Sequence, residues 1–192
     1  SFKFILKDLL IGKNSSINTI IMNFLSIDCS TDIGSLFVKT QDKTFIKVLQ
    51  NDKFNNDLLM KQILDFFEEN NLKFMDLSQI FVNQGPGNFS GLRGSLSTAK
   101  GISLAKNIDL FGYNTFLWSC AKFFNKKDSM CSLIKFREKY FVQQFDKNLK
   151  CVSKLEELTK EKIIKNYANK FKIIPKNMKK FFNASILNLK NL

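Results

Sequence analysis

The chain has 192 residues, which is enough for one good hydrophobic core or for two small lobes that share one. Its 44% hydrophobic and 24% charged residues are typical of a soluble globular protein. It has no histidine, which excludes an imidazole base and a histidine-ligated metal, and its four cysteines form no Cys-x-x-Cys pair. Structural zinc, an iron–sulfur cluster and a disulfide scaffold are therefore not expected, and we predict a reducing, cytoplasmic location.

The net charge of +13 favours an anionic partner such as a nucleic acid or an acidic protein. AT-rich coding is the alternative explanation, because Lys, Asn, Ile and Phe are all abundant while Gly, Pro and Ala are scarce. The lysines are scattered and become denser from residue 147 onward. The compositional explanation is slightly favoured, and the sequence leaves the choice open.

The first 21 residues form an unusual segment. Its apolar run at 2–11 is interrupted by Lys7 and Asp8, is too short to span a bilayer and lacks the features of a signal peptide. We interpret residues 1–21 as an extension, either from a start site assigned upstream of the true one or as a cloning remnant. A genuine added strand or helix is the alternative, and no membrane association is predicted.

Three short strands are predicted next, at 23–27, 35–40 and 44–49. A helix follows at 55–69, with Asn55, Asn56 or Asp57 as its cap. Its apolar residues cover roughly 240° of the circumference, whereas a one-sided surface helix needs a stripe of a little over 100°. One side can pack on a sheet, and the rest needs a cover from another helix or from a partner protein. We hypothesise a partner.

The glycines gather in one stretch, residues 84–94, with the sequence QGPGNFSGLRG. A buried strand is predicted before it at 79–83, and it is followed by apolar residues at helical spacing, Leu92, Leu96, Ala99 and Ile102. In such a unit, glycine permits positive φ and the close approach of a backbone or an anion, and Asn88 or Ser90 can cap the helix. The spacing matches neither a Walker loop nor a dinucleotide fingerprint, so a tight turn without a ligand is an equal alternative.

The rest of the chain predicts a reduced set of elements. These are a strand at 109–113, a helix capped by Asn114 or Thr115 that carries Phe116 to Phe124, a hairpin of 132–136 and 140–145, a helix at 156–170 and a strand at 171–174.

Two segments carry a family resemblance. Residues 85–93 (GPGNFSGLR) and 97–101 (STAKG) resemble the signature of the TsaB (YeaZ) family, and residues 22–31 (MNFLSIDCST) are similar to its first strand. The family pattern usually has Ser, Thr and a branched apolar residue where this chain has Asn88, Ser90 and Gly94. The first two changes keep an oxygen for capping, and Gly94 loosens the first helical turn. The resemblance runs from residue 22 to about residue 145.

The resemblance and the element order imply an α/β chain with the actin/Hsp70-like ATPase (ribonuclease H-like) fold. We expect an extension at 1–21, a complete N-terminal lobe with a mixed sheet at 22–128, and a reduced C-terminal lobe at 129–192. In that superfamily an acid after the first strand helps to place a metal-bound phosphate, and Asp28 has that position. The equal alternative is an acid that hydrogen-bonds the nearby backbone of a turn.

The resemblance further implies a non-catalytic scaffold and activator subunit. It would dimerise with the TsaD-type catalytic paralogue for N6-threonylcarbamoylation of adenosine 37 in tRNA. That paralogue carries metal through a His-x-x-x-His motif, which a chain without histidine cannot form, so we predict no enzyme activity, no catalytic residue and no metal. A TsaE-type ATPase and, through the complex, tRNA are further expected partners, and a homodimer is an alternative for the isolated chain. No cofactor of its own is expected, although ATP or ADP could bind at the complex interface.

The family uses the helices after its third strand and after its glycine loop for pairing, which are 55–69 and 91–106 here. The predicted partner-interface residues are Leu59, Met60, Ile63, Phe67, Leu92 and Leu96. The predicted glycine-loop residues, with nucleotide contact as an alternative role, are Asp28, Gly85, Gly87, Asn88, Ser90, Gly91 and Arg93. Arg93 lies in the first helical turn, where a cation is unfavourable to the helix dipole. An acidic partner, a loop carbonyl or a phosphate would compensate it, and a solvated side chain is the alternative.

Two other functions stay open from the residues. One is an independent nucleotide-binding phosphotransferase of the same superfold, with Asp28 and the loop at 85–91 as candidates, although the second lobe begins with Lys135, Phe136 and Arg137 where a further acid is expected. A peptidase would need a nucleophile with a base or a metal, and neither set is present.

The second open function is direct RNA binding through Arg137 and the lysines beyond residue 147.

Overall fold

The structure, a computed structural model, describes residues 23–31, 33–50, 58–136, 139–174 and 186–187. The described residues divide into two compact units, one up to Thr115 and one from Phe116 onward. The lobe limits expected from the sequence, after residues 21 and 128, stay a prediction. The predicted extension at 1–21 and the predicted helix caps at 55–57 lie outside the described residues.

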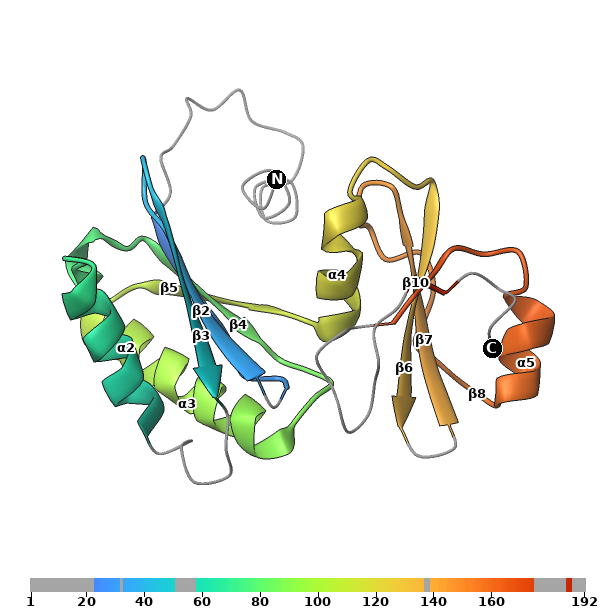
Figure 1. The fold of residues 1–192 in the computed structure, drawn as a ribbon, viewed down its shortest axis with the longest axis horizontal. Coiled ribbons are helices and arrows are strands. Elements are labelled where there is room, and N and C mark those ends of the chain that lie inside the picture. Colours follow the sequence, from blue (N-terminus) through green and yellow to red (C-terminus); the bar gives the residue numbers. More distant parts are fainter. Residues whose placement is uncertain (1–22, 32, 51–57, 137–138, 175–185, 188–192) are drawn as a thin grey trace. The chain divides into compact units, whose positions relative to one another are not determined.

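The first unit is a five-stranded sheet with two helices on one face (Figure 1). The strands run in the order β3-β2-β1-β4-β5, with β1 antiparallel to β2 and parallel to β4, and β4 parallel to β5. The two parallel pairs need crossovers, which α2 and α3 supply. The elements are β1 (Phe24–Asp28), β2 (Ile33–Lys39), β3 (Thr44–Gln50), α2 (Leu59–Glu69), the 3-10 turn η2 (Phe74–Asp76), β4 (Gln79–Asn83), α3 (Phe89–Lys106) and β5 (Asp109–Tyr113).

The core of this unit lies between the sheet and its two helices. Leu25 and Ile27 of β1 are fully buried there, beside Ile80 and Val82 of the parallel strand β4. Every second side chain of a strand points to the same face, so the alternate residues of β1 and β4 build one apolar layer. Burial of each such side chain contributes about 1.5–3 kcal/mol.

The opposite face of the sheet carries aromatic rings. The ring of Phe24 lies 5.7 Å from that of Phe37 and 5.3 Å from that of Phe81, and Phe81 stacks on Phe111 at 5.5 Å. These contacts join β2, β1, β4 and β5 and account for part of the high phenylalanine content.

Helix α3 has clear signals at both ends. The side chain of Asn88 accepts a hydrogen bond from the Gly91 backbone N at 3.3 Å, which confirms the first of the two capping predictions. Ser90, the second candidate, lies inside the helix. Asn107 ends the helix in the left-handed region with φ of 51°, a conformation that asparagine adopts more readily than most residues. The face of α3 that packs on the sheet is made of Gly91, Ser95, Ala99 and Ile102.

The second unit is also built on a five-stranded sheet, in the order β10-β9-β6-β7-β8. Strands β6 and β7 form an antiparallel hairpin, and β9 lies parallel to β6. One sheet face packs Met130 and Ile134 against α4, and the other packs Leu133 and Val142 against α5. The elements are α4 (Thr115–Cys120), the 3-10 turn η3 (Ala121–Phe123), β6 (Ser129–Phe136), β7 (Lys139–Asp146), β8 (Glu156–Leu158), α5 (Lys160–Asn166), β9 (Lys172–Ile173) and β10 (Ile186–Leu187).

The helix predicted at 156–170 is wrong at both ends, because α5 covers only Lys160–Asn166. Glu156–Leu158 is the edge strand β8, in which Leu158 lies opposite Tyr140 of β7. Helix α5 begins only at Lys160. Strand pairing here outweighs the helix propensity of Glu and Leu, which is a weak preference.

The predicted α/β fold class is confirmed. The first unit has the complete order of three strands, helix, strand, helix and strand of an actin-like (ribonuclease H-like) lobe, with a mixed sheet. The second unit repeats an antiparallel hairpin but has shorter helices, with 6 residues in α4 and 7 in α5 against 11 in α2 and 18 in α3. Within the described residues, no helix is both long and apolar enough to cross a membrane.

Candidate functional site

The glycine loop meets the β1–β2 turn at the carboxyl ends of β1 and β4, where Asp28 binds the turn and the last residue of β4. Its Oδ1 accepts hydrogen bonds from the backbone N and the hydroxyl of Ser30, at 2.9 and 2.7 Å. Its Oδ2 accepts one from Nδ2 of Asn83 at 3.1 Å. The carboxylate is thus used within its own chain, as the turn interpretation requires, while a nucleotide contact stays a prediction. We call Asp28, Ser30 and Asn83 the Asp28 network.

Asn83, which the sequence reasoning missed, joins three segments. It is fully buried at the end of β4, and its Nδ2 also donates to Oγ of Ser30 at 3.1 Å. Its Oδ1 accepts from the backbone N of Gly85 at 2.8 Å and from Oγ1 of Thr115 at 3.3 Å. Gly85 has φ of 96°, which glycine adopts without strain. The sequence signal for Asn83 is a polar residue that ends an apolar strand.

Two glycines of the loop lie against the β1–β2 turn with no room for a side chain. A Cβ at Gly87 would lie 2.3 Å from the carbonyl oxygen of Ser30, and one at Gly91 would lie 2.1 Å from that of Cys29. The backbone N of Asn88 donates to the same Ser30 oxygen at 2.7 Å. The backbone that approaches these glycines is therefore the chain's own, so packing alone accounts for them.

Tyr113, at the end of β5, lies beside the Asp28 network. Its hydroxyl is 3.3 Å from Oγ of Ser26. Burial raises the pKa of Tyr113 well above its ordinary value of 10.0, and the nearby charge of Asp28 raises it further. The hydroxyl therefore stays protonated at neutral pH and adds hydrogen bonding without charge.

Arg93 and Phe89 form an exposed pair at the start of α3. The guanidinium carbon lies 5.4 Å from the centre of the Phe89 ring, within the range of a cation–π contact, and Phe89 is 71% exposed. The ring thus offsets part of the unfavourable interaction between the Arg93 charge and the positive end of the helix dipole. Ser90, the other polar residue of this turn, is exposed.

The predicted partner-interface residues separate into two groups. Leu59, Ile63 and Phe67 point into the core of the first unit and are at most 5% exposed. Met60 and Leu96 are 38% and 36% exposed, and Leu92 is half-buried. The sequence reasoning missed three other exposed apolar residues at the same two helices. Leu58 directly precedes α2, Leu64 lies in α2 and Leu104 lies in α3.

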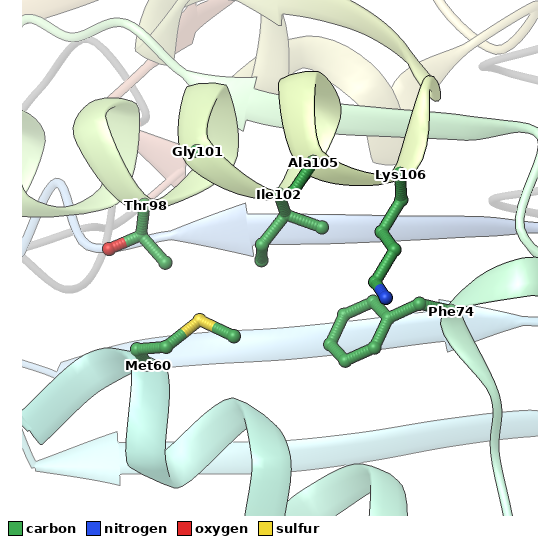
Figure 2. A pocket seen from close by; sticks show the side chains of 7 residues that line it. All are labelled: Met60, Phe74, Thr98, Gly101, Ile102, Ala105 and Lys106. Atoms are coloured by element: carbon green, nitrogen blue, oxygen red, sulfur yellow. The ribbon is translucent and has the colours of Figure 1, made fainter.

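A groove of about 290 Å³ lies between α2 and α3. Figure 2 shows Met60 and Phe74 on one side of it, facing the α3 residues across the gap. A Cβ at Gly101 would meet no atom within 4 Å, so the missing side chain of this glycine helps to keep the groove open. The lining is mostly apolar and consists of Met60, Phe74, Thr98, Gly101, Ile102, Ala105 and Lys106.

The chemistry of the Asp28 network suits a structural joint, because its polar groups bind one another. In the part of the chain that the structure describes, no three Cys, Asp or Glu side chains gather where they could hold a metal ion. The absence of metal and cofactor stays a prediction.

Comparison with known proteins gives a family. The family model described as TsaD, tRNA N6-adenosine threonylcarbamoyltransferase, matches residues 53–186, which is more than half of the chain. None of the curated proteins compared matches the sequence.

Two solved structures from Pseudomonas aeruginosa are similar to this one. YeaZ has a TM-score of 0.63 and 14% identity, over 72% of this chain and 68% of that chain. An uncharacterized protein with similarity to peptidase YeaZ has the same score and identity, over 72% and 67%. At this identity the likeness shows the fold. The fold is that of YeaZ, which confirms the TsaB (YeaZ) resemblance found in the sequence. Because the family model matches most of the chain, residues 53–186, the chain belongs to the TsaD family of tRNA N6-adenosine threonylcarbamoyltransferases.

Proposed function

We propose that this chain is a non-catalytic scaffold and activator subunit that dimerises with a TsaD-type catalytic paralogue. Together they would carry out N6-threonylcarbamoylation of adenosine 37 in tRNA. The family match supports a role in this modification. The lack of histidine supports the accessory role, because a His-x-x-x-His metal motif cannot form. A TsaE-type ATPase and tRNA join through the complex, and ATP or ADP binds at its interface if at all.

The observation that carries this proposal is the exposed apolar surface on α2 and α3. Leu58, Met60 and Leu64 are 46%, 38% and 48% exposed. Leu96 and Leu104 of α3 are 36% and 83% exposed. We call these five residues the helix-pair surface. Met60 lines the groove between the two helices. Exposed apolar side chains of this kind mark protein–protein contact sites, and a partner helix would cover those that face it.

The glycine loop serves this surface by fixing the start of α3. The Asp28 network holds the loop, and the tight contacts of Gly87 and Gly91 hold it against the β1–β2 turn. The orientation of α3 relative to α2 is thereby set from one end. In this proposal the loop is a positioning device.

The alternative, an independent nucleotide-binding phosphotransferase, has less support from the geometry. Its candidate acid, Asp28, accepts three hydrogen bonds from Ser30 and Asn83. A metal-bound phosphate would have to compete with these bonds. The peptidase role named for the similar structure would need a nucleophile with a base or metal, which the residues of this chain do not suggest.

The test is co-expression with the cognate TsaD-type protein, followed by size-exclusion chromatography with light scattering. We expect a one-to-one complex that Met60→Asp or Leu64→Asp disrupts, with at least a 100-fold rise in dissociation constant. The reason is that an unpaired carboxylate in an apolar contact costs several kcal/mol. Core residues such as Leu59 and Ile63 are unsuitable, because the same change there would unfold the unit.

A matched control is Ile46→Asp, the same kind of exchange at a residue of β3 that is 67% exposed. It should leave the complex intact. Loss of the complex in the control but not in the two helix variants would refute the helix-pair surface. No complex, together with ATP hydrolysis that Asp28→Ala abolishes, would favour the phosphotransferase.

A further inference from the structure

Most of the excess positive charge of the chain lies in residues 116–192. Residues 23–115 contain 9 basic and 10 acidic residues, whereas residues 116–192 contain 18 basic and 6 acidic residues. A coding bias toward lysine would act on both units alike. The asymmetry therefore indicates that a surface of the second unit meets an anionic partner.

Four exposed lysines gather at one end of the second sheet, where β6 begins and β7 ends (Figure 1). Lys126 and Lys127 lie in the turn after η3, and Lys147 and Lys150 lie in the turn after β7. A hydrogen bond of 2.8 Å from the backbone N of Asn125 to the carbonyl oxygen of Lys147 joins the two turns. We call these four residues the lysine cluster.

The charges of the lysine cluster are not neutralised by nearby acids. Among the described residues, the ion pairs join Lys47 with Glu69 and Lys139 with Glu157, and none involves the cluster. The acids closest in sequence are Asp128, which is exposed, and Asp146. Oδ1 of Asp146 accepts from the backbone N of Asn148 and of Lys150, so this carboxylate holds the turn. The ammonium groups therefore remain available to an outside anion.

Aromatic rings accompany the cluster. Nζ of Lys127 lies 5.0 Å from the centre of the Phe171 ring, and this ring packs edge-on against that of Phe123 at 4.9 Å. Both rings are half-buried, so part of each is accessible. Basic groups beside accessible rings are typical of surfaces that bind looped RNA, where phosphates meet the lysines and bases stack on the rings.

We propose that the lysine cluster is an RNA-contact surface that binds the phosphate backbone of tRNA. The choice of RNA over an acidic protein or a membrane rests on the proposed function, which brings tRNA to the complex. Lysine offers a point charge without the fork geometry of arginine, so the contact holds the backbone and reads no sequence. Binding therefore does not depend on the nucleotide at position 37.

The test is filter binding of the full chain to a tRNA transcript over a series of salt concentrations. Lys126→Gln/Lys147→Gln is expected to weaken binding and to lower the magnitude of the salt slope by about 2, one for each lysine. The matched control is Lys43→Gln/Lys73→Gln, which removes two exposed lysines of the first unit and should change neither quantity. An equal loss in both double variants, or no loss in the first, overturns the proposal.

The other anionic partners are tested at the same ionic strength. Vesicles that contain phosphatidylserine, and polyglutamate, should bind more weakly than tRNA and should not distinguish the two double variants. Tighter, cluster-dependent binding of either probe overturns the choice of RNA.

Failure of this inference can be told apart from failure of the proposed function. The cluster variant should still pair with the TsaD-type protein, and Met60→Asp should still bind tRNA in isolation. Failure of the unmodified chain to pair with the TsaD-type protein, while its tRNA binding still depends on the cluster, contradicts the scaffold role alone. If the chain pairs with the TsaD-type protein but its tRNA binding is the same with and without the cluster lysines, only the RNA-contact surface is contradicted.

Discussion

Gly91 lies at the first turn of α3, where the helix crosses the β1–β2 turn. Because a Cβ there would lie 2.1 Å from the carbonyl oxygen of Cys29, Gly91→Ala must displace backbone. Overpacking of this kind costs about 1–3 kcal/mol. We expect the free energy of unfolding in urea, followed by circular dichroism, to fall by that amount in the absence of any ligand.

The matched control is Gly101→Ala in the same helix, where a new Cβ meets no atom within 4 Å. Alanine in a helix interior is favoured over glycine by about 0.5–1 kcal/mol, so this variant should be as stable as the parent or more so. If both variants unfold alike, the contact with Cys29 does not explain the glycine. If Gly91→Ala lowers stability only when nucleotide is present, a phosphate role is favoured instead.

At this scale the sequence predicts the local features and misses the long-range ones. The cap at Asn88 follows from its position before a helix, and the structure confirms it. The role of Asn83 does not follow, because its partner Asp28 is 55 residues away in sequence. A carboxylate's partners are fixed by strand order, which the periodicity of a single segment does not contain.

The two helices of the first unit show what periodicity does and does not predict. The existence of α2 and its excess of apolar residues were predicted, and part of that excess is exposed at Met60 and Leu64. Which residues face the core was not predictable, because an arc of roughly 240° has no unique inner side. The sheet selects Ile63, Phe66 and Phe67 as the inner set.

The groove between α2 and α3 gives a prediction for the pair of helices. Gly101→Leu places a large apolar side chain in the open space beside Met60 and Phe74. We expect stability to be unchanged or higher, and affinity for the TsaD-type partner to fall at least 10-fold, because the partner side chain that enters the groove is excluded. Isothermal titration calorimetry with the purified partner measures this.

The control for the groove is Gly101→Ala, whose single methyl group leaves most of the 290 Å³ open. It should keep nearly full affinity. Equal affinity of the leucine and alanine variants would show that the partner does not enter the groove, although it could still cover the helix-pair surface.

Across the whole molecule, both units carry acidic groups that burial keeps neutral. Burial raises the pKa of Tyr113 in the first unit and of Tyr167 in the second. It raises the pKa of Cys131 from 9.0 to about 11 and that of Cys120 from 9.0 to about 12. Composition predicts free cysteines but not their burial, because the pairing of β6 with β7 and β9 decides which residues are enclosed.

These shifts predict that the protein loses stability in alkali. The unfolded chain releases a thiol proton near pH 9, whereas the folded chain retains it until the raised pKa. The stabilisation is therefore fully present below pH 9 and falls as the pH rises toward 11, by about 1.4 kcal/mol per pH unit for each thiol.

The measurement is urea unfolding between pH 8 and pH 10 for the parent, Cys131→Ala and Cys151→Ala. Cys151→Ala is the matched control for the loss of one thiol, because Cys151 is exposed. Cys131→Ala lacks one thiol that keeps its proton in the folded chain. Its free energy of unfolding should therefore fall less steeply with pH than that of the parent. A loss of packing would lower the whole curve without changing this slope. Ionisation of lysines is common to all three chains and cancels in the comparison. Parallel profiles for Cys131→Ala and the parent would contradict the raised pKa of Cys131, and with it the closed packing of β6 against β7 and α5.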